Sequence, residues 1–204
     1  MPIGENAQYK SIVHDGVVVT ATQTPEDVVF LQELIRKERP AVIVELGTFM
    51  GGLTLALHEA APEARLYTCD RLVATEGEYV TTHPHGSHHY RRDWYGSSVV
   101  FCRADVLSET MAPELAEAFA LPGRKLVLCD NGHKPTELRM YAPRLRRGDI
   151  IGVHDWPDEI NAAAVEGSLD NYEPFLWDLC EEVGPGLLWR FWKAIAPCNI
   201  LRTT

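Results

Sequence analysis

Short apolar runs alternate with amphipathic segments along most of this chain. Runs rich in β-branched and other apolar residues predict strands at residues 16–20, 42–46, 65–69, 99–102, 125–129 and 149–153. Apolar residues at helical spacing predict helices within residues 24–39, 52–60, 108–121, 135–145 and 174–182. A late alternating run at 187–194 predicts a strand antiparallel to the others. Strands that alternate with helices predict an α/β fold around a mostly parallel sheet.

Two stretches fit neither pattern and are predicted as loops near a binding site. Residues 71–96 contain four histidines without the spacing of a metal site, so a polar loop is the favoured interpretation, with its aromatic end at Trp94 and Tyr95 as a lid. Residues 156–172 are acidic and predict a loop with a short helix at the pocket mouth. Both stretches are candidate substrate loops.

The segment from Val42 to Ala56 predicts a strand, a glycine turn and a helix. Glycines let the chain bend sharply and let a ligand touch the backbone, and the helix start offers unpaired N–H groups. The turn is neither a P-loop nor G-x-G-x-x-G. The spacing of Glu45, Gly47 and Gly51 suits a ligand with a cationic or zwitterionic head, such as S-adenosylmethionine, although such turns also occur without a ligand.

Polar residues follow the predicted strands, and in a parallel sheet these ends meet at one edge, where ligands bind. Asp70, after the second strand, is the candidate for the ribose hydroxyls, or else an ordinary strand-end acid. Asp105, after the third, is the candidate for the adenine amino group, or else a cap.

Asp130 and Asp155 follow neighbouring predicted strands, and two carboxylates so close need a cation or a proton between them. A divalent metal is the favoured interpretation: carboxylates suit Mg²⁺ or Mn²⁺, and His154 can join as a softer ligand. The alternative places His154 in the core and Asp155 as a helix cap.

His133 follows Asp130 by three residues and is the candidate base, because a neutral imidazole can take a proton from a hydroxyl whose pKa a metal has lowered. Lys134 is the competing base, but an unperturbed lysine is protonated at neutral pH. A structural histidine is the other interpretation.

Composition narrows the class of protein. The chain has 204 residues, with 46% hydrophobic and 24% charged residues, which is typical of one globular domain; residues 1–23 form an N-terminal extension. The net charge of −10 argues against a nucleic-acid partner. The five cysteines are odd in number and show no C-x-x-C spacing, which indicates a reduced protein. The sequence shows no apolar leader and no apolar run of membrane-spanning length, so we expect a cytoplasmic protein without a membrane partner. A homo-oligomer is left open.

With these pieces in order, the chain resembles the class I S-adenosylmethionine-dependent methyltransferases over roughly residues 24–194. The segment TPEDVVFLQELIRKERPAVIVELGTFMGG resembles the Pro-Glu-Asp helix and the following cofactor strand of the cephalosporin hydroxylase and rhamnosyl O-methyltransferase group. The segment LCDNGHKPTELRMYAPRLRRGDIIGVHDW is similar to the Asp-Gly-Asp-His block and the later acidic pair of metal-dependent O-methyltransferases. The resemblance implies a Rossmann-like, doubly wound, mostly parallel seven-stranded sheet with an antiparallel late strand.

The resemblance also implies roles for individual residues. The methionine part of the cofactor is expected to contact Glu45, Gly47 and Gly51, with Thr48 and Phe49 of the same turn. The ribose is expected to bind Asp70, beside Arg71. The adenine is expected to bind Asp105. Asp130 and Asp155 are implied metal ligands, with His154 where relatives often have an acid and Asn131-Gly132 where many have Gly-Asp. Asp130 also borders the cofactor, and with His133 it is a predicted catalytic residue.

The predicted function is S-adenosylmethionine-dependent, divalent-metal-assisted methyl transfer to a hydroxyl of a small molecule, such as a sugar or a natural-product scaffold. The first alternative is a cephalosporin-hydroxylase-like biosynthetic enzyme that works with a partner. The second is a cofactor-binding subunit without chemistry.

Overall fold

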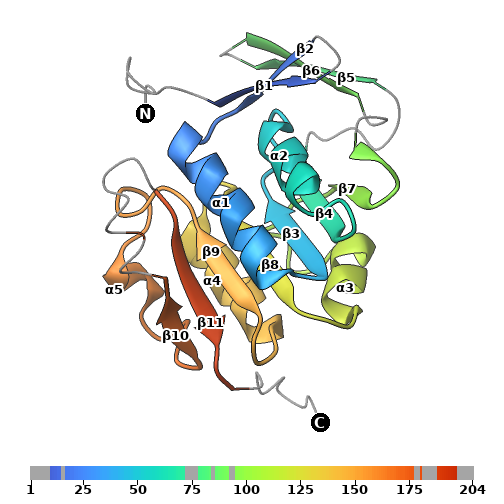
Figure 1. Cartoon of the computed structure of the whole chain (residues 1–204). Helices are drawn as coiled ribbons and strands as arrows, with labels where there is room; N and C mark the ends of the chain where they lie inside the picture. The colour runs from blue at the N-terminus through green and yellow to red at the C-terminus, as the bar shows by residue number, and fades with distance from the viewer. Residues whose placement is uncertain are drawn as a thin grey trace.

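The computed structural model describes residues 10–14, 17–71, 78–83, 86–91, 95–176, 180 and 188–196. Its centre is a seven-stranded sheet in the order β10-β11-β9-β8-β3-β4-β7 (Figure 1). The strands are β3 Val42–Leu46, β4 Arg65–Asp70, β7 Val99–Arg103, β8 Lys125–Cys129, β9 Ile150–Val153, β10 Tyr172–Phe175 and β11 Arg190–Ala194. The five strands from β9 to β7 are mutually parallel and β11 pairs antiparallel with β9, which confirms the predicted fold class and the antiparallel late strand.

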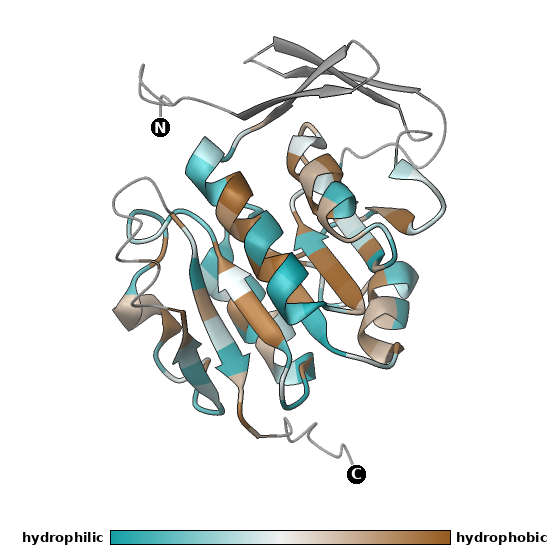
Figure 2. Cartoon of the chain, in the orientation of Figure 1, coloured by the Kyte–Doolittle hydropathy of each residue, from teal (hydrophilic) through white to brown (hydrophobic). Residues whose placement is uncertain are grey.

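Helices cover both faces of this sheet. On one face lie α1 (Pro25–Glu38) and α2 (Gly52–Ala60), and on the other lie α3 (Pro113–Ala120) and α4 (Lys134–Tyr141), which continues into a 3-10 turn at Ala142–Arg144. In Figure 2 β3 is mostly brown, whereas α1 alternates between brown and teal, as expected for a buried strand and an amphipathic helix.

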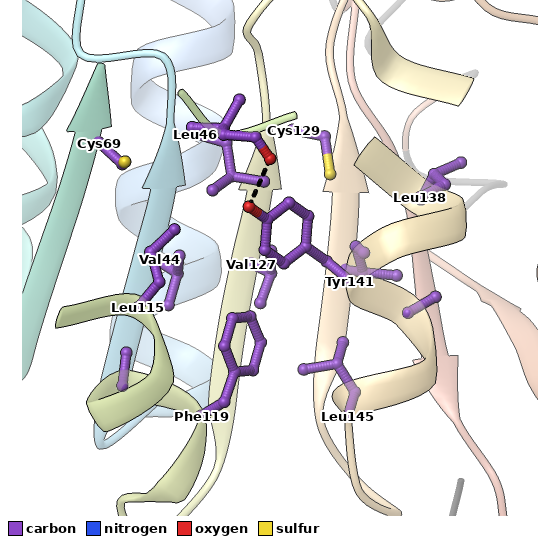
Figure 3. Close-up of a cluster of buried hydrophobic side chains, with 14 of the residues drawn as sticks. Val44, Leu46, Cys69, Leu115, Phe119, Val127, Cys129, Leu138, Tyr141 and Leu145 are labelled. Carbon is purple, nitrogen blue, oxygen red and sulfur yellow. Dashed lines mark hydrogen bonds between the residues drawn. The ribbon is translucent and has the colours of Figure 1, made fainter. Parts of the chain in front are cut away.

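The core is divided by the alternation of side chains along the central strand. Val44 and Leu46 of β3 join the cluster under α3 and α4, where the ring of Tyr141 stacks on Phe119 at 5.7 Å between ring centroids (Figure 3). Ile43 points to the opposite face and packs with α1 and α2. The neighbouring Glu45 therefore shares the face of Ile43, beneath α2.

The start of α1 is closed by two reciprocal hydrogen bonds. The hydroxyl of Thr24 accepts a hydrogen bond from the backbone N–H of Asp27 at 3.1 Å, and the Asp27 carboxylate accepts one from the backbone N–H of Thr24 at 3.2 Å. This reciprocal pair is a capping box, and it satisfies two N–H groups of the chain at the helix start.

Two hairpins complete the described structure. Strand β1 (Lys10–His14) pairs with β2 (Val17–Ala21), and β5 (Glu78–His83) pairs with β6 (Gly86–Arg91); β2 contacts both β6 and α2 (Figure 1). The prediction of a loop over residues 71–96 was therefore wrong at β5 and β6. The alternating, β-branched stretch around Tyr79, Val80 and Thr81 favours pairing, and the histidine count had obscured it. Trp94 lies outside the described residues.

Other element boundaries also differ from prediction. Pro174 belongs to β10 rather than to a helix; this strand lies at the sheet edge, where a residue without an N–H is tolerated. Helix α3 begins at Pro113, five residues later than predicted. The short helix α5 (Ala162–Val165) confirms the helix predicted within residues 156–172, and the position of this stretch at the pocket mouth stays a prediction. Among the described helices, none combines the length and the apolar character that crossing a bilayer requires.

Candidate active site at the carboxyl edge of the sheet

The sheet topology places the glycine turn between two carboxylates. Leu46, the last residue of β3, pairs with Cys69 on β4 and with Cys129 on β8. The next residues, Asp70 and Asp130, therefore lie at the same level on either side of Gly47. Strands β4 and β8 flank β3, and the chain reaches them in opposite directions across the sheet. This is the switch point at which doubly wound sheets bind ligands.

The turn after β3 requires glycine at its first position. Gly47 has φ +105°, its N–H donates to the Cys69 carbonyl at 2.9 Å, and a Cβ there would lie 2.5 Å from the Asp130 carbonyl oxygen. Gly51, with φ +76°, precedes α2 as its N-cap. Between them, the N–H of Phe49 donates to Asp70 Oδ2 at 3.2 Å, which ties the turn to the end of β4.

A cavity of about 220 Å³ opens at this turn. Its wall is formed by Ala21, Thr22, Gln23, Gly47, Thr48, Phe49, Met50, Gly52, Leu53, Asp70, Asp130 and Asn131. Five of the residues predicted to bind the cofactor are in this wall: Gly47, Thr48, Phe49, Asp70 and Asp130. Four others, Glu45, Gly51, Arg71 and Asp105, lie outside it.

Glu45 lies beneath the turn and not in the cavity wall. The residue has no exposed surface, and its Oε2 accepts hydrogen bonds from Thr54 of α2 at 2.5 Å and Thr68 of β4 at 2.6 Å. Burial raises the pKa of Glu45 to about 8, although these two hydrogen bonds act in the other direction. In this arrangement Glu45 joins β3 to α2 and supports the turn from below.

Arg71 and Asp105 form an ion pair beyond the cavity. The guanidinium of Arg71 lies 2.7 Å from Asp105 Oδ2, and the other oxygen of Asp105 accepts the backbone N–H of Leu107 at 2.9 Å. The Leu107 N–H, followed by Arg71, lowers the pKa of Asp105. The predicted contact of Asp105 with an adenine stays a prediction.

His133 lies at the N-cap of α4, with an exposed side chain. Its backbone N–H donates to Glu137 Oε1 at 3.1 Å, and its imidazole makes no hydrogen bond with any residue that the structure describes. The ring is close enough to Asp105 for its charge to affect that carboxyl, and it lies outside the cavity wall. The role of His133 as a base stays a prediction.

Asp130, His154 and Asp155 converge at the ends of β8 and β9. Atom Nδ1 of His154 lies 3.1 Å from Asp130 Oδ1 and 3.3 Å from Asp155 Oδ1. One ligand atom from each of these residues lies within 4.8 Å of the other two, a spacing that could hold a metal ion. The structure thus brings together the residues predicted as metal ligands.

Asp130, His154 and Asp155 each have a second polar atom that points away from the other two residues, and each of these atoms has a partner. Asp130 Oδ2 accepts a hydrogen bond from Gln23 Nε2 at 2.6 Å, and His154 Nε2 lies 3.4 Å from Asp27 Oδ2. These partners orient the inward atoms, as outer contacts do around metal ligands.

The ammonium of Lys134 holds the third side chain. Its Nζ lies 2.6 Å from Asp155 Oδ2, 2.6 Å from Glu159 Oε2 and 3.7 Å from Asp130 Oδ1, and its side chain is only 3% exposed. Burial lowers the pKa of Lys134, but Asp130 and Asp155 more than offset this and raise it above its ordinary value. Lys134 is therefore a fixed cation within the cluster, and its ammonium is not a ready base.

His154 and Asp155 titrate far from their ordinary ranges. Burial lowers the pKa of His154, but the charge of Asp130 and hydrogen bonds to its neighbours raise it well above the ordinary value. Burial raises the pKa of Asp155, while His154 and Lys134 bring it well below the ordinary value. Without a metal, a proton on Nδ1 of His154 fills the position between the two carboxylates.

Four residues of the site were not predicted from the sequence: Gln23, Asp27, Lys134 and Glu159. Lys134 was considered only as a competing base, and Asp27 lies in the first turn of α1, apart from the sheet edge in the sequence. Gln23 lies 107 positions from its partner Asp130, so local pattern could not indicate the pair. The sequence did contain a signal for Lys134. An acidic segment follows the strand at 149–153, and such a segment can pair with a buried cation: Asp155, Asp158 and Glu159.

The model of the Rhamnosyl O-methyltransferase/CmcI family matches residues 11–168. The chain belongs to this family. It is an S-adenosylmethionine-dependent methyltransferase of class I, as the sequence resemblance implied. The comparison with curated proteins found no match.

Solved structures of CmcI have the same fold as this family member. The CmcI apo structure superposes with a TM-score of 0.65 at 14% identity, covering 91% of this chain and 76% of that one. CmcI with SAH gives 0.62 at 12% identity, with 89% and 81% covered. CmcI with Mg-SAM gives 0.52 at 14% identity, with 71% and 57% covered.

Proposed function

We propose that this enzyme transfers the methyl group of S-adenosylmethionine to a hydroxyl of a small molecule, with a divalent cation held by Asp130, His154 and Asp155. One observation carries the proposal: Asp130 belongs both to the cavity wall and to the metal-ligand cluster. A cofactor in the cavity and a cation in the cluster would share this carboxylate. The methyl donor would then lie beside the group that binds the acceptor hydroxyl.

The donor set supports a cation of the Mg²⁺ or Mn²⁺ class. The inward atoms are two carboxylate oxygens and one imidazole nitrogen, while Gln23, Asp27 and Lys134 hold the outer atoms. A solved structure of the relative CmcI contains Mg-SAM. A divalent cation in this position supplies positive charge that favours the deprotonated form of an acceptor hydroxyl.

The protein's own residues would provide orientation and proton transfer. The glycine turn and Asp70 would hold the nucleoside, and Asp130 would fix the relative position of donor and acceptor. We assign His133 as the base, because its exposed imidazole is not committed to another described residue and it stands at the start of α4, beside the cluster. The family description and the hydroxyl chemistry favour a sugar or a natural-product scaffold as acceptor.

An acceptor screen with methyl-labelled S-adenosylmethionine tests this function. Phenols, catechols and sugars would be incubated with the enzyme, with Mg²⁺, with Mn²⁺ and with chelator, and methylated products would be identified by mass spectrometry. We expect methyl ethers that form only in the presence of a cation. Cofactor binding with no turnover on any acceptor would contradict the proposal and favour a binding subunit, and turnover only with an added protein would favour a two-component enzyme.

A further inference from the structure

Asp27 holds the far side of the His154 ring. The Asp27 carboxylate has no exposed surface, and its Oδ2 lies 3.4 Å from Nε2 of His154, a residue that is only 5% exposed. The same carboxylate accepts the backbone N–H of Thr24 at 3.2 Å and that of Leu188 at 2.9 Å, so two distant segments of the chain fix it. The imidazole also packs on Trp189 at 5.0 Å between ring centroids. The ring is therefore held both at its edge and on its face.

These contacts decide which ring nitrogen faces the metal-ligand cluster. Both oxygens of Asp27 act as acceptors, so Nε2 of His154 is the nitrogen that carries a hydrogen toward it. Nδ1 lies 3.1 Å from Asp130 Oδ1 and 3.3 Å from Asp155 Oδ1, between the two carboxylates. A carboxylate behind a ligating histidine fixes its tautomer and makes the inward nitrogen a better ligand. Nδ1 is thus the atom that this arrangement offers to a metal ion.

A nitrogen in the donor set separates cations of similar size. Mg²⁺ prefers oxygen ligands, whereas divalent transition metals bind imidazole well. One of the three ligand atoms of the cluster is the nitrogen of His154, and the other two are carboxylate oxygens. Co²⁺ and Mg²⁺ have nearly the same radius, so the difference between their affinities reports the chemistry of the ligands and not the room between them.

We propose that the Asp27–His154 pair makes the cluster selective for a divalent transition metal, such as Mn²⁺ or Fe²⁺, over Mg²⁺. This selectivity rests on the proposed function and deepens it, because it names the class of cation that assists the methyl transfer. Asp27 is a positioning residue in this arrangement, since it acts on the metal through His154. The first turn of α1 thereby takes part in the metal site, 127 positions before its partner.

Calorimetric titrations with Co²⁺ and with Mg²⁺ test the selectivity. The wild-type enzyme should bind Co²⁺ at least about 100-fold more tightly than Mg²⁺. His154→Asp replaces the nitrogen ligand by an oxygen, so the ratio of the two affinities should fall by about tenfold or more. His58→Asp is the matched control. It makes the same substitution on α2, where His58 contacts Ser98, and should leave the ratio unchanged.

Asp27→Asn tests the positioning role. Loss of the carboxylate behind the ligand should weaken Co²⁺ binding by about 10- to 100-fold, and Mg²⁺ binding by clearly less. Asp27 also caps α1, so Thr24→Ala is the control for a damaged helix start. This variant removes the hydroxyl that accepts the N–H of Asp27 but keeps the backbone N–H that holds the Asp27 carboxylate. Both affinities should stay within about twofold of wild type.

The proton NMR spectrum of the Co²⁺ form gives a second readout. Nε2–H of a Co²⁺-bound His154 should give a strongly shifted signal that disappears in heavy water and is missing in His154→Asp. Absence of this signal in wild type, or an equal affinity ratio in wild type and His154→Asp, overturns the selectivity even if Asp27→Asn does not fold. Equal losses of Co²⁺ affinity in Asp27→Asn and Thr24→Ala would overturn the role of Asp27. A wild-type enzyme that binds neither cation would instead overturn the metal-assisted function.

Discussion

The ammonium of Lys134 lies 2.6 Å from a carboxylate oxygen of Asp155 inside the molecule, and an equal distance from Glu159. Sequence reasoning held that neighbouring acids at this edge need a cation, and the chain itself provides one. Lys134 leaves Asp155 Oδ1 directed toward His154, so the lysine and a metal ion would use different oxygens of the same carboxylate.

Replacing Lys134 by methionine should destabilise the fold. The substitution removes the charged hydrogen bonds to Asp155 and Glu159, whose side chains are 29% and 43% exposed, so the free energy of unfolding should fall by about 1–3 kcal/mol in urea titrations. Lys37→Met, on the exposed side of α1, should change it by less than about 0.5 kcal/mol. Equal effects of the two substitutions would show that the Lys134 pair contributes little to stability.

Chelation should leave the fold intact. Lys134 and the protonated His154 already compensate Asp130 and Asp155, so removing divalent cations exposes no unpaired acid. Thermal unfolding followed by circular dichroism should still show one cooperative transition in chelator, with a midpoint below that at saturating Mn²⁺ only by the few degrees that cation binding to the folded state adds. A large drop on chelation would mean that a metal, and not Lys134, holds the cluster together.

The metal-ligand cluster itself can be tested with Mn²⁺ and Asp155→Asn. Loss of one anionic ligand should weaken Mn²⁺ binding by at least about tenfold in calorimetric titrations. The exposed neighbour variant Asp158→Asn changes the net charge equally and should leave the affinity within about twofold. If both variants lose affinity to the same extent, Mn²⁺ is attracted by the acidic surface rather than bound at the cluster.

The sheet and the glycine turn could be predicted because their signals are local. Each buried strand is an apolar run that ends in a polar residue, and parallel register then sets Asp70 and Asp130 beside Gly47. The contacts that complete the site join distant segments: Gln23 meets Asp130 across 107 positions, and His154 meets Asp27 across 127. Which residues meet in such contacts depends on how the helices and strands pack, and the local sequence pattern does not predict it.

Glu45 illustrates the same limit at a single residue. The spacing with Gly47 and Gly51 indicated a ligand contact, but strand alternation turns the side chain beneath α2, toward Thr54 and Thr68. An acid at the end of a buried strand can therefore serve the fold directly below a site. Which face it takes depends on how the following helix packs.

Substitution of His133 by alanine separates catalysis from cofactor binding. If His133 removes the acceptor proton, kcat should fall by about 100-fold or more, while the dissociation constant for S-adenosylmethionine stays within about twofold. His58→Ala is the control. His58 lies near the end of α2, where it contacts Ser98, and its substitution should change neither kcat nor the dissociation constant. The reverse pattern, with unchanged kcat and weaker cofactor binding, would place His133 at the adenine end of the site, beside Asp105.

Glu45 predicts a pH dependence of stability with a definite sign. Burial raises its pKa from 4.5 to about 8, so between these values the folded protein keeps a proton that the unfolded chain has lost. The stabilising contribution is complete below about pH 4.5 and is lost as the pH rises toward 8, with a slope of at most about 1.4 kcal/mol per pH unit. Glu45→Gln, which mimics the protonated carboxyl, should remove this slope.

Urea titrations at pH 5, 6, 7 and 8 test this expectation. The free energy of unfolding of Glu45→Gln should rise relative to that of wild type at each step, whereas that of the exposed variant Glu33→Gln should follow wild type. A constant difference between Glu45→Gln and wild type across this range would mean that Glu45 is already ionised in the fold, held by the hydroxyls of Thr54 and Thr68.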